Sequence, residues 1–284
     1  MERLGDVEAW RAFAEAQRAA GRRVGLVPTM GALHAGHVAL FRAARDHGDV
    51  VVATSFVNPR QFHDAADLAA YPHDPEGDRA VADALVDVFV EPALAEMWPD
   101  YPGETATTVS VHGLGDVLEG AGRPGHFDGV ASVVAKLFAI TGPCRAYFGE
   151  KDYQQLVVVR RLVRDLAFDV EVVGCPIVRD ADGLAVSSRN VRLGPSGRTQ
   201  ASALSRAVAA AGSRRAPASA LRRAMHEVLA DARVEVAYAE VVDPGSLAPT
   251  HDDETGERRA LVAGLVEGVR LIDNGPVTVE REAP

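Results

Sequence analysis

The segment from Pro28 to His37 combines two imidazoles and two glycines between an apolar run and an amphipathic run. The apolar run Val24–Val27 predicts a strand, and Val38–Arg45 predicts a helix that begins at this segment. The first turn of a helix has unpaired backbone N–H groups and the positive end of the dipole, which both attract phosphate. His34 and His37 are three apart, so on a first helical turn they share a face. These residues favour a nucleotide-phosphate site with two imidazoles directed at the phosphates.

Two other interpretations of His34 and His37 stay open from these residues alone. They could be helix-start histidines that make local hydrogen bonds, or ligands of zinc. Zinc is disfavoured because no cysteine or acid nearby completes a tetrahedral set. In the catalytic interpretation, His37 donates a proton or a hydrogen bond to a phosphate, which stabilises a leaving pyrophosphate.

Two further polar clusters follow apolar runs. Gln61 lies in Ser55–Phe62 and offers both a donor and an acceptor, which suits a hydroxy acid. Gly149–Gln155 contains Lys151, which can reach phosphate oxygens. Lys136 and Lys151 are the only lysines, so a lysine within a motif indicates a need for a compact ammonium. The ordinary alternatives are a strand-end turn for the first cluster and a helix N-terminus for the second.

A fourth cluster, Asp182–Asn190, contains two serine hydroxyls followed by Arg189, a donor set suited to phosphates. A serine-rich turn after Asp-Gly explains the same residues. Arg123–Phe127 precedes a predicted helix and fits either an anion-facing helix start or an ordinary Pro-Gly loop.

Strand and helix patterns alternate along the first part of the chain, which predicts an α/β fold with a mostly parallel sheet and helices on both faces. In such sheets ligands bind beyond the carboxyl ends of the strands, where the polar clusters lie. The expected strands are 24–27, 50–57, 86–90, 109–111, 146–148 and 169–174. The expected helices are 6–20, 75–85, 129–140 and 152–166.

The pattern changes after about residue 176. Two Ala- and Arg-rich helices are expected at 196–211 and 218–229, and strands at 234–238 and 261–266. We therefore expect a first domain over 1–176 and a smaller C-terminal α+β domain over 177–284.

Composition limits the possible classes of protein. The 284 residues are 47% hydrophobic and 25% charged, as in globular proteins. A net charge of −10 argues against a nucleic-acid or membrane surface. The chain has no apolar run of membrane-spanning length and no signal-peptide pattern, so a cytoplasmic location is expected. Cys144 and Cys175 are far apart, which argues against a disulfide framework or a structural zinc site.

The ordered set of motifs resembles the pantothenate synthetase (pantoate–β-alanine ligase) family. The H-x-G-H piece alone is shared with the wider H-x-G-H nucleotidyltransferase superfamily. The matching segments run nearly end to end and comprise Pro28–His37, Phe56–Phe62, Arg123–Val130, Tyr147–Leu156, Asp182–Asn190, Ala239–Pro244 and Arg270–Asn274.

The resemblance implies a two-step reaction. ATP and pantoate give pantoyl adenylate and pyrophosphate, and the amine of β-alanine then attacks the acyl carbon to give pantothenate and AMP. It also implies Mg²⁺ with ATP and a cytoplasmic homodimer. The implied fold is a Rossmann-like first domain followed by a small C-terminal domain that closes over the site.

The resemblance also implies residue roles. His37 is the catalytic proton donor, with His34 and Lys151 assisting at the phosphates. Gln61 and Gln155 hold pantoate, and Gln61 also contacts β-alanine. No metal ligand is assigned. The implied ATP-binding residues are Met30, Gly31, Ala32, Leu33, His34, Ala35, Gly36, His37, Gly149, Glu150, Lys151, Asp152, Val178, Val186, Ser187, Ser188 and Arg189.

The sequence departs from the family at two places. Tyr71-Pro72-His73-Asp74 stands where the family usually has Tyr-Pro-Arg-Thr, and Val186 stands where Met or Leu is usual. The loss of the arginine changes the local charge, since His73 replaces it only when protonated.

Two other functions compete with this expectation. One is another nucleotidyltransferase, which attaches a nucleotide to a phosphorylated substrate. The other is a catalytically silent nucleotide-binding protein. The motifs of Gln61 and Gln155 suit an uncharged diol with a carboxylate and argue against the first. The intact His34, His37 and Lys151 argue against the second.

Overall fold

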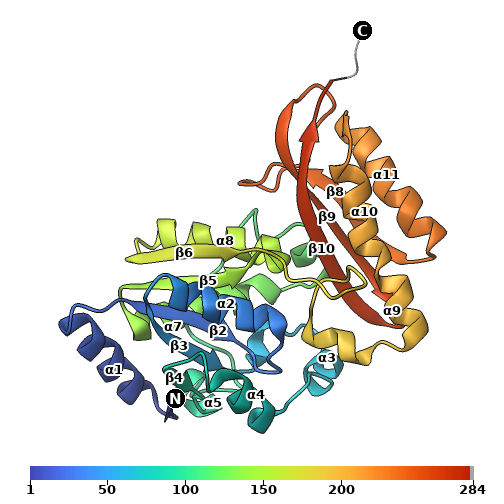
Figure 1. The fold of residues 1–284 in the computed structure, drawn as a ribbon. Helices are drawn as coiled ribbons and strands as arrows, with labels where there is room; N and C mark the ends of the chain where they lie inside the picture. Colours follow the sequence, from blue (N-terminus) through green and yellow to red (C-terminus); the bar gives the residue numbers. More distant parts are fainter. Residues whose placement is uncertain (282–284) are drawn as a thin grey trace. The chain divides into compact units, whose positions relative to one another are not determined.

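The computed structural model describes residues 1–281 and divides the chain into two compact units (Figure 1). The first comprises Met1–Glu150 and Gln155–Pro176, and the second comprises Lys151–Gln154 and the chain from Ile177 onward. The four residues Lys151–Gln154 thus group with the second unit, although they follow a strand of the first and include the first two residues of the next helix. No helix within residues 1–281 is long and apolar enough to span a bilayer.

The first unit is built on a six-stranded, wholly parallel sheet. The strand order is β1-β4-β3-β2-β5-β6. Without the edge strand β1 this is Rossmann-like order, which reverses between β2 and β5. The predicted α/β class and parallel sheet are confirmed. The strands are β1 (Glu2–Leu4), β2 (Val24–Thr29), β3 (Val50–Ser55), β4 (Val88–Val90), β5 (Cys144–Gly149) and β6 (Val170–Cys175).

Helices cover both faces of this sheet. Alternate strand residues such as Val27, Ala53 and Phe89 pack against α2 and α4. A Cβ at Gly174 would point the other way and lie 3.0 Å from Leu156 of α8. The helices of this unit are α1 (Val7–Ala19), α2 (Ala35–Asp46), α3 (Ala65–Ala69), α4 (Pro75–Ala82), α5 (Leu94–Met97), α6 (Glu119–Gly122), α7 (His126–Thr141) and α8 (Tyr153–Asp165), with short 3₁₀ turns η1 (Pro59–Gln61) and η2 (Glu150–Asp152).

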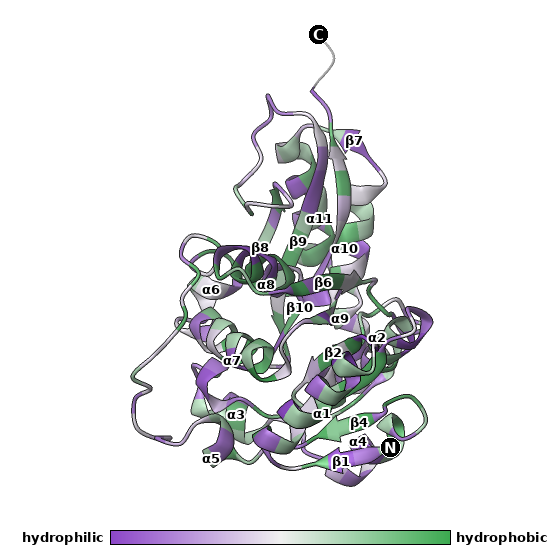
Figure 2. Ribbon diagram, turned by 90° about the vertical axis from the view of Figure 1, so that its left-hand side faces the viewer, coloured by the Kyte–Doolittle hydropathy of each residue, from purple (hydrophilic) through white to green (hydrophobic). Residues whose placement is uncertain are grey.

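Two details of the first unit differ from expectation. The strand β1 is absent from the predicted strands, because three residues at a sheet edge are too short to show a periodicity. The expected strand 109–111 does not form; the N–H of Val109 instead donates to Ser132 Oγ at 2.9 Å. The central strands form as predicted, because a strand buried on both faces is apolar along its whole length, as β4 is in Figure 2.

The second unit is a four-stranded sheet in the order β7-β10-β9-β8. The strands β8, β9 and β10 run antiparallel, and β7 pairs parallel with β10. The unit contains β7 (Arg215–Ala216), β8 (Glu235–Val242), β9 (Gly256–Val266), β10 (Val269–Val279), α9 (Pro195–Ala201), α10 (Ala203–Gly212), α11 (Ala218–Asp231) and the 3₁₀ turn η3 (Ser188–Arg192).

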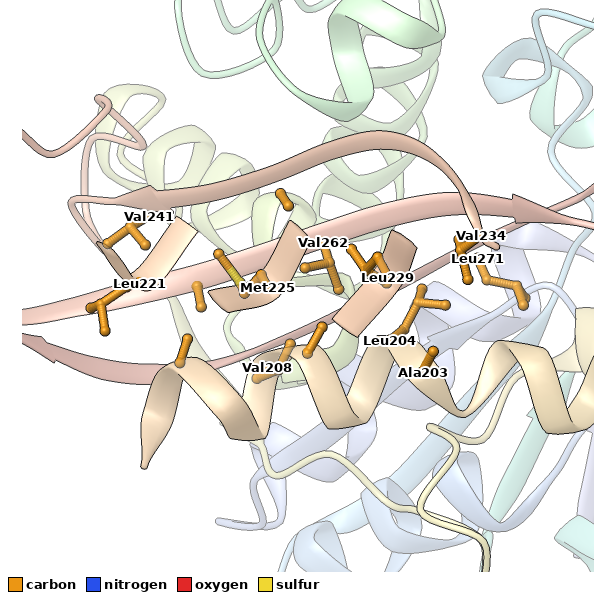
Figure 3. Packing of buried hydrophobic residues seen from close by; sticks show 14 of the residues in the cluster. Ala203, Leu204, Val208, Leu221, Met225, Leu229, Val234, Val241, Val262 and Leu271 are labelled. Carbon is orange, nitrogen blue, oxygen red and sulfur yellow. The ribbon is translucent and has the colours of Figure 1, made fainter. Parts of the chain in front are cut away.

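Helices α10 and α11 form the core of this unit with the sheet. Figure 3 shows Val208 and Met225 of the helices facing Val262 of β9, and all three are buried. Burial of these apolar side chains stabilises the packing of the two helices on the sheet of the second unit.

Two details of the second unit differ from expectation, the helix expected at 196–211 and the last strand. The helix divides at Ser202, whose hydroxyl donates to the carbonyl of Thr199 and so competes with the helical bonds. Strand β10 is absent from the predicted strands. Its signal is Glu267-Gly268, a two-residue hairpin turn with φ of 50° and 75° at these residues.

Candidate active site

The turn after β2 is held by a buried carboxylate. Asp78, on α4, accepts hydrogen bonds from the N–H of Ala32 at 2.9 Å and of Leu33 at 2.6 Å. Gly31 has φ +75°, and a Cβ there lies 2.7 Å from Asp78 Oδ2 and 2.9 Å from Ser55 Oγ. Only glycine fits this position without displacing its neighbours. No local pattern points to Asp78, because its partners lie more than 40 residues away.

The two histidines form a capping box at the start of α2. His34 is the N-cap and accepts at Nδ1 from the N–H of Gly36 at 3.1 Å. His37 Nδ1 accepts from the N–H of His34 at 3.2 Å. Their rings stack with centroids 4.1 Å apart. His34 is the N-cap and His37 lies on the first turn, so the two rings share one face of the helix start, as their spacing of three predicts. The expectation of local hydrogen bonds, which was the ordinary alternative, describes both residues.

This capping box fixes the tautomers. A ring nitrogen that accepts from a backbone N–H carries no proton, so both neutral rings hold theirs on Nε2. Each imidazole is therefore a hydrogen-bond donor through Nε2. That polarity suits a phosphate oxygen, and the helix N-terminus adds to it.

Gln61 comes from the turn after β3, the neighbour of β2 in the sheet. Its Nε2 lies 2.9 Å from Met30 Sδ, and its Oε1 accepts from Asn58 Nδ2 at 3.1 Å. The structure therefore brings the second motif to the first, at the carboxyl ends of adjacent strands. Gln155 is half-buried on the first turn of α8, and no hydrogen bond within residues 1–281 joins it to Gln61.

His126 and Arg123 brace the same turn. The carbonyl of Gln61 only accepts, so His126 Nδ1, at 2.7 Å, donates to it. Arg123 Nη1 lies 3.1 Å from His126 Nε2, and only the guanidinium of this pair can donate. Gly129, one helical turn on, has no room for a Cβ, which would lie 2.2 Å from the carbonyl oxygen of Arg60. The motif Arg123–Val130 thus acts as a support for Gln61.

Strand β5 brings Gly149 and Glu150 to the point where the strand order reverses. This strand pairs with β2 at Gly25 and Leu26, so the carboxyl ends of the two strands are neighbours. Rossmann-like sheets bind ligands at this crevice. The sheet alone therefore places Met30–His37 and Gly149–Glu150 at one edge of the first unit.

The second unit fixes the backbone of Lys151. Asn274 Nδ2 donates to the carbonyl of Lys151 at 2.8 Å, and Asn274 Oδ1 accepts from Arg259 Nε at 2.8 Å. The Arg259 guanidinium also lies 4.2 Å from the ring centroid of Tyr153. The ammonium of Lys151 is 3.6 Å from Asp152 Oδ1. The contacts of Asn274 and Arg259 thus join Lys151 and Tyr153 to the second unit.

The remaining predicted nucleotide residues lie on one hairpin of the second unit. The N–H of Val186 donates to the carbonyl of Val178 at 2.9 Å. Arg179, beside Val178, forms an ion pair with the buried Asp273 at 2.6 Å. Ser187 is the N-cap of η3 and accepts from the N–H of Arg189 at 3.3 Å. The structure thus brings Val178 and Val186–Arg189 together.

The unusual segment Tyr71–Asp74 has a local role. His73 is exposed, and Asp74 is the N-cap of α4, accepting from the N–H of Gly77 at 3.0 Å. Aspartate is as good an N-cap as threonine. This replacement therefore preserves the start of the helix that carries Asp78.

The strand order and the polar residues at the β2–β5 edge define an α/β protein of the Rossmann-like class. The family model described as pantoate-beta-alanine ligase matches residues 2–276. The chain belongs to this family of ligases, as the motifs predict.

Known relatives agree with this assignment. The pantothenate synthetase of Cereibacter sphaeroides is 51% identical over 279 residues, covering 96% of this chain and 99% of the relative. That of Moorella thermoacetica is 48% identical, covering 96% and 98%. The crystal structure of pantothenate synthetase from Thermus thermophilus has a TM-score of 0.88 and 46% identity, over 97% of this chain and 99% of that one.

One similar structure contains ligands. The pantoate-beta-alanine ligase from Francisella tularensis, complexed with beta-gamma ATP and beta-alanine, has a TM-score of 0.80. It is 30% identical, and the match covers 97% of each chain.

Proposed function

We propose that this enzyme uses ATP to condense pantoate with β-alanine, giving pantothenate, AMP and pyrophosphate through a pantoyl adenylate. Family membership across residues 2–276 supports the overall reaction. The observation that carries the chemistry is the capping box, which makes both His34 and His37 donors through Nε2 at a helix N-terminus. The ligands of the similar Francisella protein point to the same small-molecule substrates.

The chemistry explains why donors and cations are needed. A carboxylate is a poor acyl donor until one of its oxygens becomes part of a good leaving group. In the first step a pantoate carboxylate oxygen attacks the α-phosphorus, and the bond to pyrophosphate breaks. The amine of β-alanine then forms the C–N bond, AMP departs with the carboxyl oxygen, and the amine loses a proton. Both steps depend on positioning and charge stabilisation.

The first unit supplies groups for the first step. His37 donates to the departing pyrophosphate through Nε2, and His34 assists. The backbone of Gly31–Gly36 contacts the nucleotide, with Ala32 and Leu33 held in place by Asp78. Gln61 and Gln155 hold pantoate, and Gln61 also contacts β-alanine. A covalent nucleophile is not needed, because the acyl adenylate is itself the activated intermediate.

The second unit supplies positive charge. Lys151 interacts with the phosphates as a point charge, and Ser187, Ser188 and Arg189 complete the nucleotide-binding set with Val178 and Val186. The backbone bond from Asn274 to Lys151 supports this role, because it fixes the stem from which the ammonium extends.

Mg²⁺ is part of the proposal as a partner of ATP. Residues 1–281 contain no group of three or more His, Cys, Asp or Glu side chains arranged to hold a metal ion. This fits an ion held chiefly by phosphate oxygens and water, as is usual for Mg²⁺ with nucleotides. It supplies charge neutralisation at the phosphates when bound. We further propose a cytoplasmic homodimer.

Pyrophosphate exchange tests the proposal. Purified enzyme with ATP, Mg²⁺, labelled pyrophosphate and pantoate, but no β-alanine, should form labelled ATP. Omission of pantoate should abolish the exchange. A folded enzyme that makes pantothenate without supporting this exchange would overturn the adenylate intermediate. An enzyme that makes no pantothenate from the three substrates would overturn the function.

A further inference from the structure

The side chain of Gln61 ends a chain of three buried groups. Trp98 Nε1 donates to Asn58 Oδ1 at 2.9 Å, and Asn58 Nδ2 donates to Gln61 Oε1 at 3.1 Å. The exposed fractions of Trp98, Asn58 and Gln61 are 6%, 1% and 8%. Little water therefore competes for these bonds, and each unmade bond leaves a buried polar group unsatisfied.

The indole sets the direction of the whole chain together with the backbone N–H of Arg60, which also donates to Asn58 Oδ1, at 3.3 Å. An amide can present either its oxygen or its NH₂ group, but an indole N–H can only donate. Trp98 therefore requires Asn58 to turn its oxygen toward the indole. The NH₂ group of Asn58 then faces Gln61 and the carbonyl of Gly129, which lies at 3.1 Å. Gln61 must in turn place its oxygen toward Asn58 and its NH₂ group toward Met30.

The indole itself is held by two cations. The guanidinium of Arg60 lies 5.3 Å from the centroid of the Trp98 ring, and the ammonium of Lys136 lies 5.5 Å from it. Lys136 also donates to the carbonyls of Glu96 and Met97 at 3.0 and 2.6 Å. One of the only two lysines of the chain thus supports the tryptophan.

The side-chain NH₂ group of Gln61 has no strong hydrogen-bond acceptor within residues 1–281. Its Nε2 contacts only the thioether of Met30, which is a weak acceptor. A rotated amide would set two NH₂ groups against each other at Asn58 and two acceptors against each other at Met30. The orientation is therefore fixed before any ligand arrives, with an N–H available for a stronger acceptor.

We propose that Trp98 is a positioning residue that sets the polarity of Gln61, so that the Gln61 NH₂ group donates to an oxygen of the bound hydroxy acid. The inference rests on the proposed function, in which Gln61 holds pantoate. Trp98 acts through Asn58 and Gln61 and does not itself contact the substrate.

Trp98→Phe tests this role, because it keeps an aromatic ring beside Arg60 and Lys136 but removes the N–H. We expect the KM for pantoate to rise about tenfold, the effect of one lost hydrogen bond, and the KM for ATP to stay within about twofold of the original. Trp10→Phe is the matched control. Trp10 is also fully buried, and its Nε1 has no hydrogen-bond partner within the described residues, so neither KM should change.

A double-mutant cycle separates positioning from general loss of structure. In a Gln61→Ala background, Trp98→Phe should have no further effect on the KM for pantoate, since the group it orients is gone. Additive effects would overturn the proposal, as would an unchanged KM for pantoate in Trp98→Phe or an equal rise in both KM values.

An isosteric replacement covers the case in which Trp98→Phe folds poorly. The chain has two tryptophans, so in Trp10→Phe the remaining one is Trp98. Growth on benzothienylalanine then replaces the indole N–H by sulfur with little change of shape. The same tenfold rise in the KM for pantoate is expected. An unchanged KM would refute the proposal. If the original enzyme makes no pantothenate, the proposed function fails. If the enzyme is active but the Trp98 variants have the same KM for pantoate as the Trp10→Phe control, only the inference about Trp98 fails.

Discussion

Asn274 donates from Nδ2 to the carbonyl oxygen of Lys151 at 2.8 Å, although the two residues are 123 positions apart. The orientation of the Asn274 amide is fixed, because its oxygen accepts from the donor-only guanidinium of Arg259. The lysine that the motifs select is therefore positioned by a strand of the second unit.

Asn274→Asp should weaken ATP binding selectively. Aspartate keeps the acceptor for Arg259 but replaces the donor to Lys151 by an oxygen that faces another oxygen. We expect the KM for ATP to rise about five- to tenfold, with the KM for pantoate nearly unchanged. Steady-state kinetics with each substrate varied in turn measures both. A rise in the KM for pantoate alone would contradict the role given to Asn274.

Gly31→Ala should be far more harmful than Gly48→Ala. Both glycines have φ near +75°, so both variants carry the cost of a left-handed alanine, about 1–2 kcal/mol. At Gly48 nothing lies within 4 Å of the added Cβ, whereas at Gly31 it meets Asp78 and Ser55. The stability measured by urea unfolding and the exchange rate should both fall further for Gly31→Ala. Equal effects in the two variants would show that crowding at the turn is unimportant.

His37 has a structural and a proposed chemical role, which two substitutions separate. His37→Ala removes both, and should lower pantoate-dependent exchange by about two orders of magnitude or more. His37→Gln keeps a side chain that can complete a capping box, so it should retain thermal stability yet lose a similar share of activity. Near-normal exchange by His37→Gln would show that the imidazole is needed only as a cap.

Lys151→Arg should lower activity despite the retained charge. The guanidinium is planar and larger than the ammonium, so it cannot make the point contact with phosphate oxygens that we propose for Lys151. We expect at least a roughly tenfold loss in exchange rate, by analogy with other misplaced catalytic groups. Arg223→Lys, an exposed exchange of the same two residue types on α11, is the control. An unchanged exchange rate in Lys151→Arg would mean that the scarcity of lysine in this chain does not indicate a chemical need for lysine at position 151.

The two cysteines should resist alkylation in the folded protein. Burial raises the pKa of Cys144 from 9.0 to about 12 and that of Cys175 from 9.0 to about 11. At pH 8 both thiols are then almost wholly protonated, so iodoacetamide should react slowly until urea is added. Because the folded pKa values are raised, the unfolded state loses its thiol protons first, and stability should fall as the pH rises above about 9. Rapid labelling of the folded enzyme at pH 8 would contradict this burial.

The central strands and the site motifs could be predicted from the sequence because their signals are local. A strand buried on both faces, such as β3, is apolar throughout, and the glycines and histidines of Gly31–His37 lie beside the strand that positions them. Strand β10 has no such local signal, because its polar residues Asp273 and Asn274 are buried and their hydrogen-bond partners lie elsewhere in the sequence.

The sequence alone is enough to predict the α/β class, the family and the chemistry expected of His37, Gln61 and Lys151. The tertiary structure decided which residues hold them in place. Asp78 lies 45 positions from its partner Leu33, and Trp98 lies 40 positions from Asn58. Asn274 lies 123 positions from Lys151. Hydrogen bonds over such separations leave no periodicity or motif behind, because either partner alone is an ordinary polar residue; only folding brings the donor and the acceptor together.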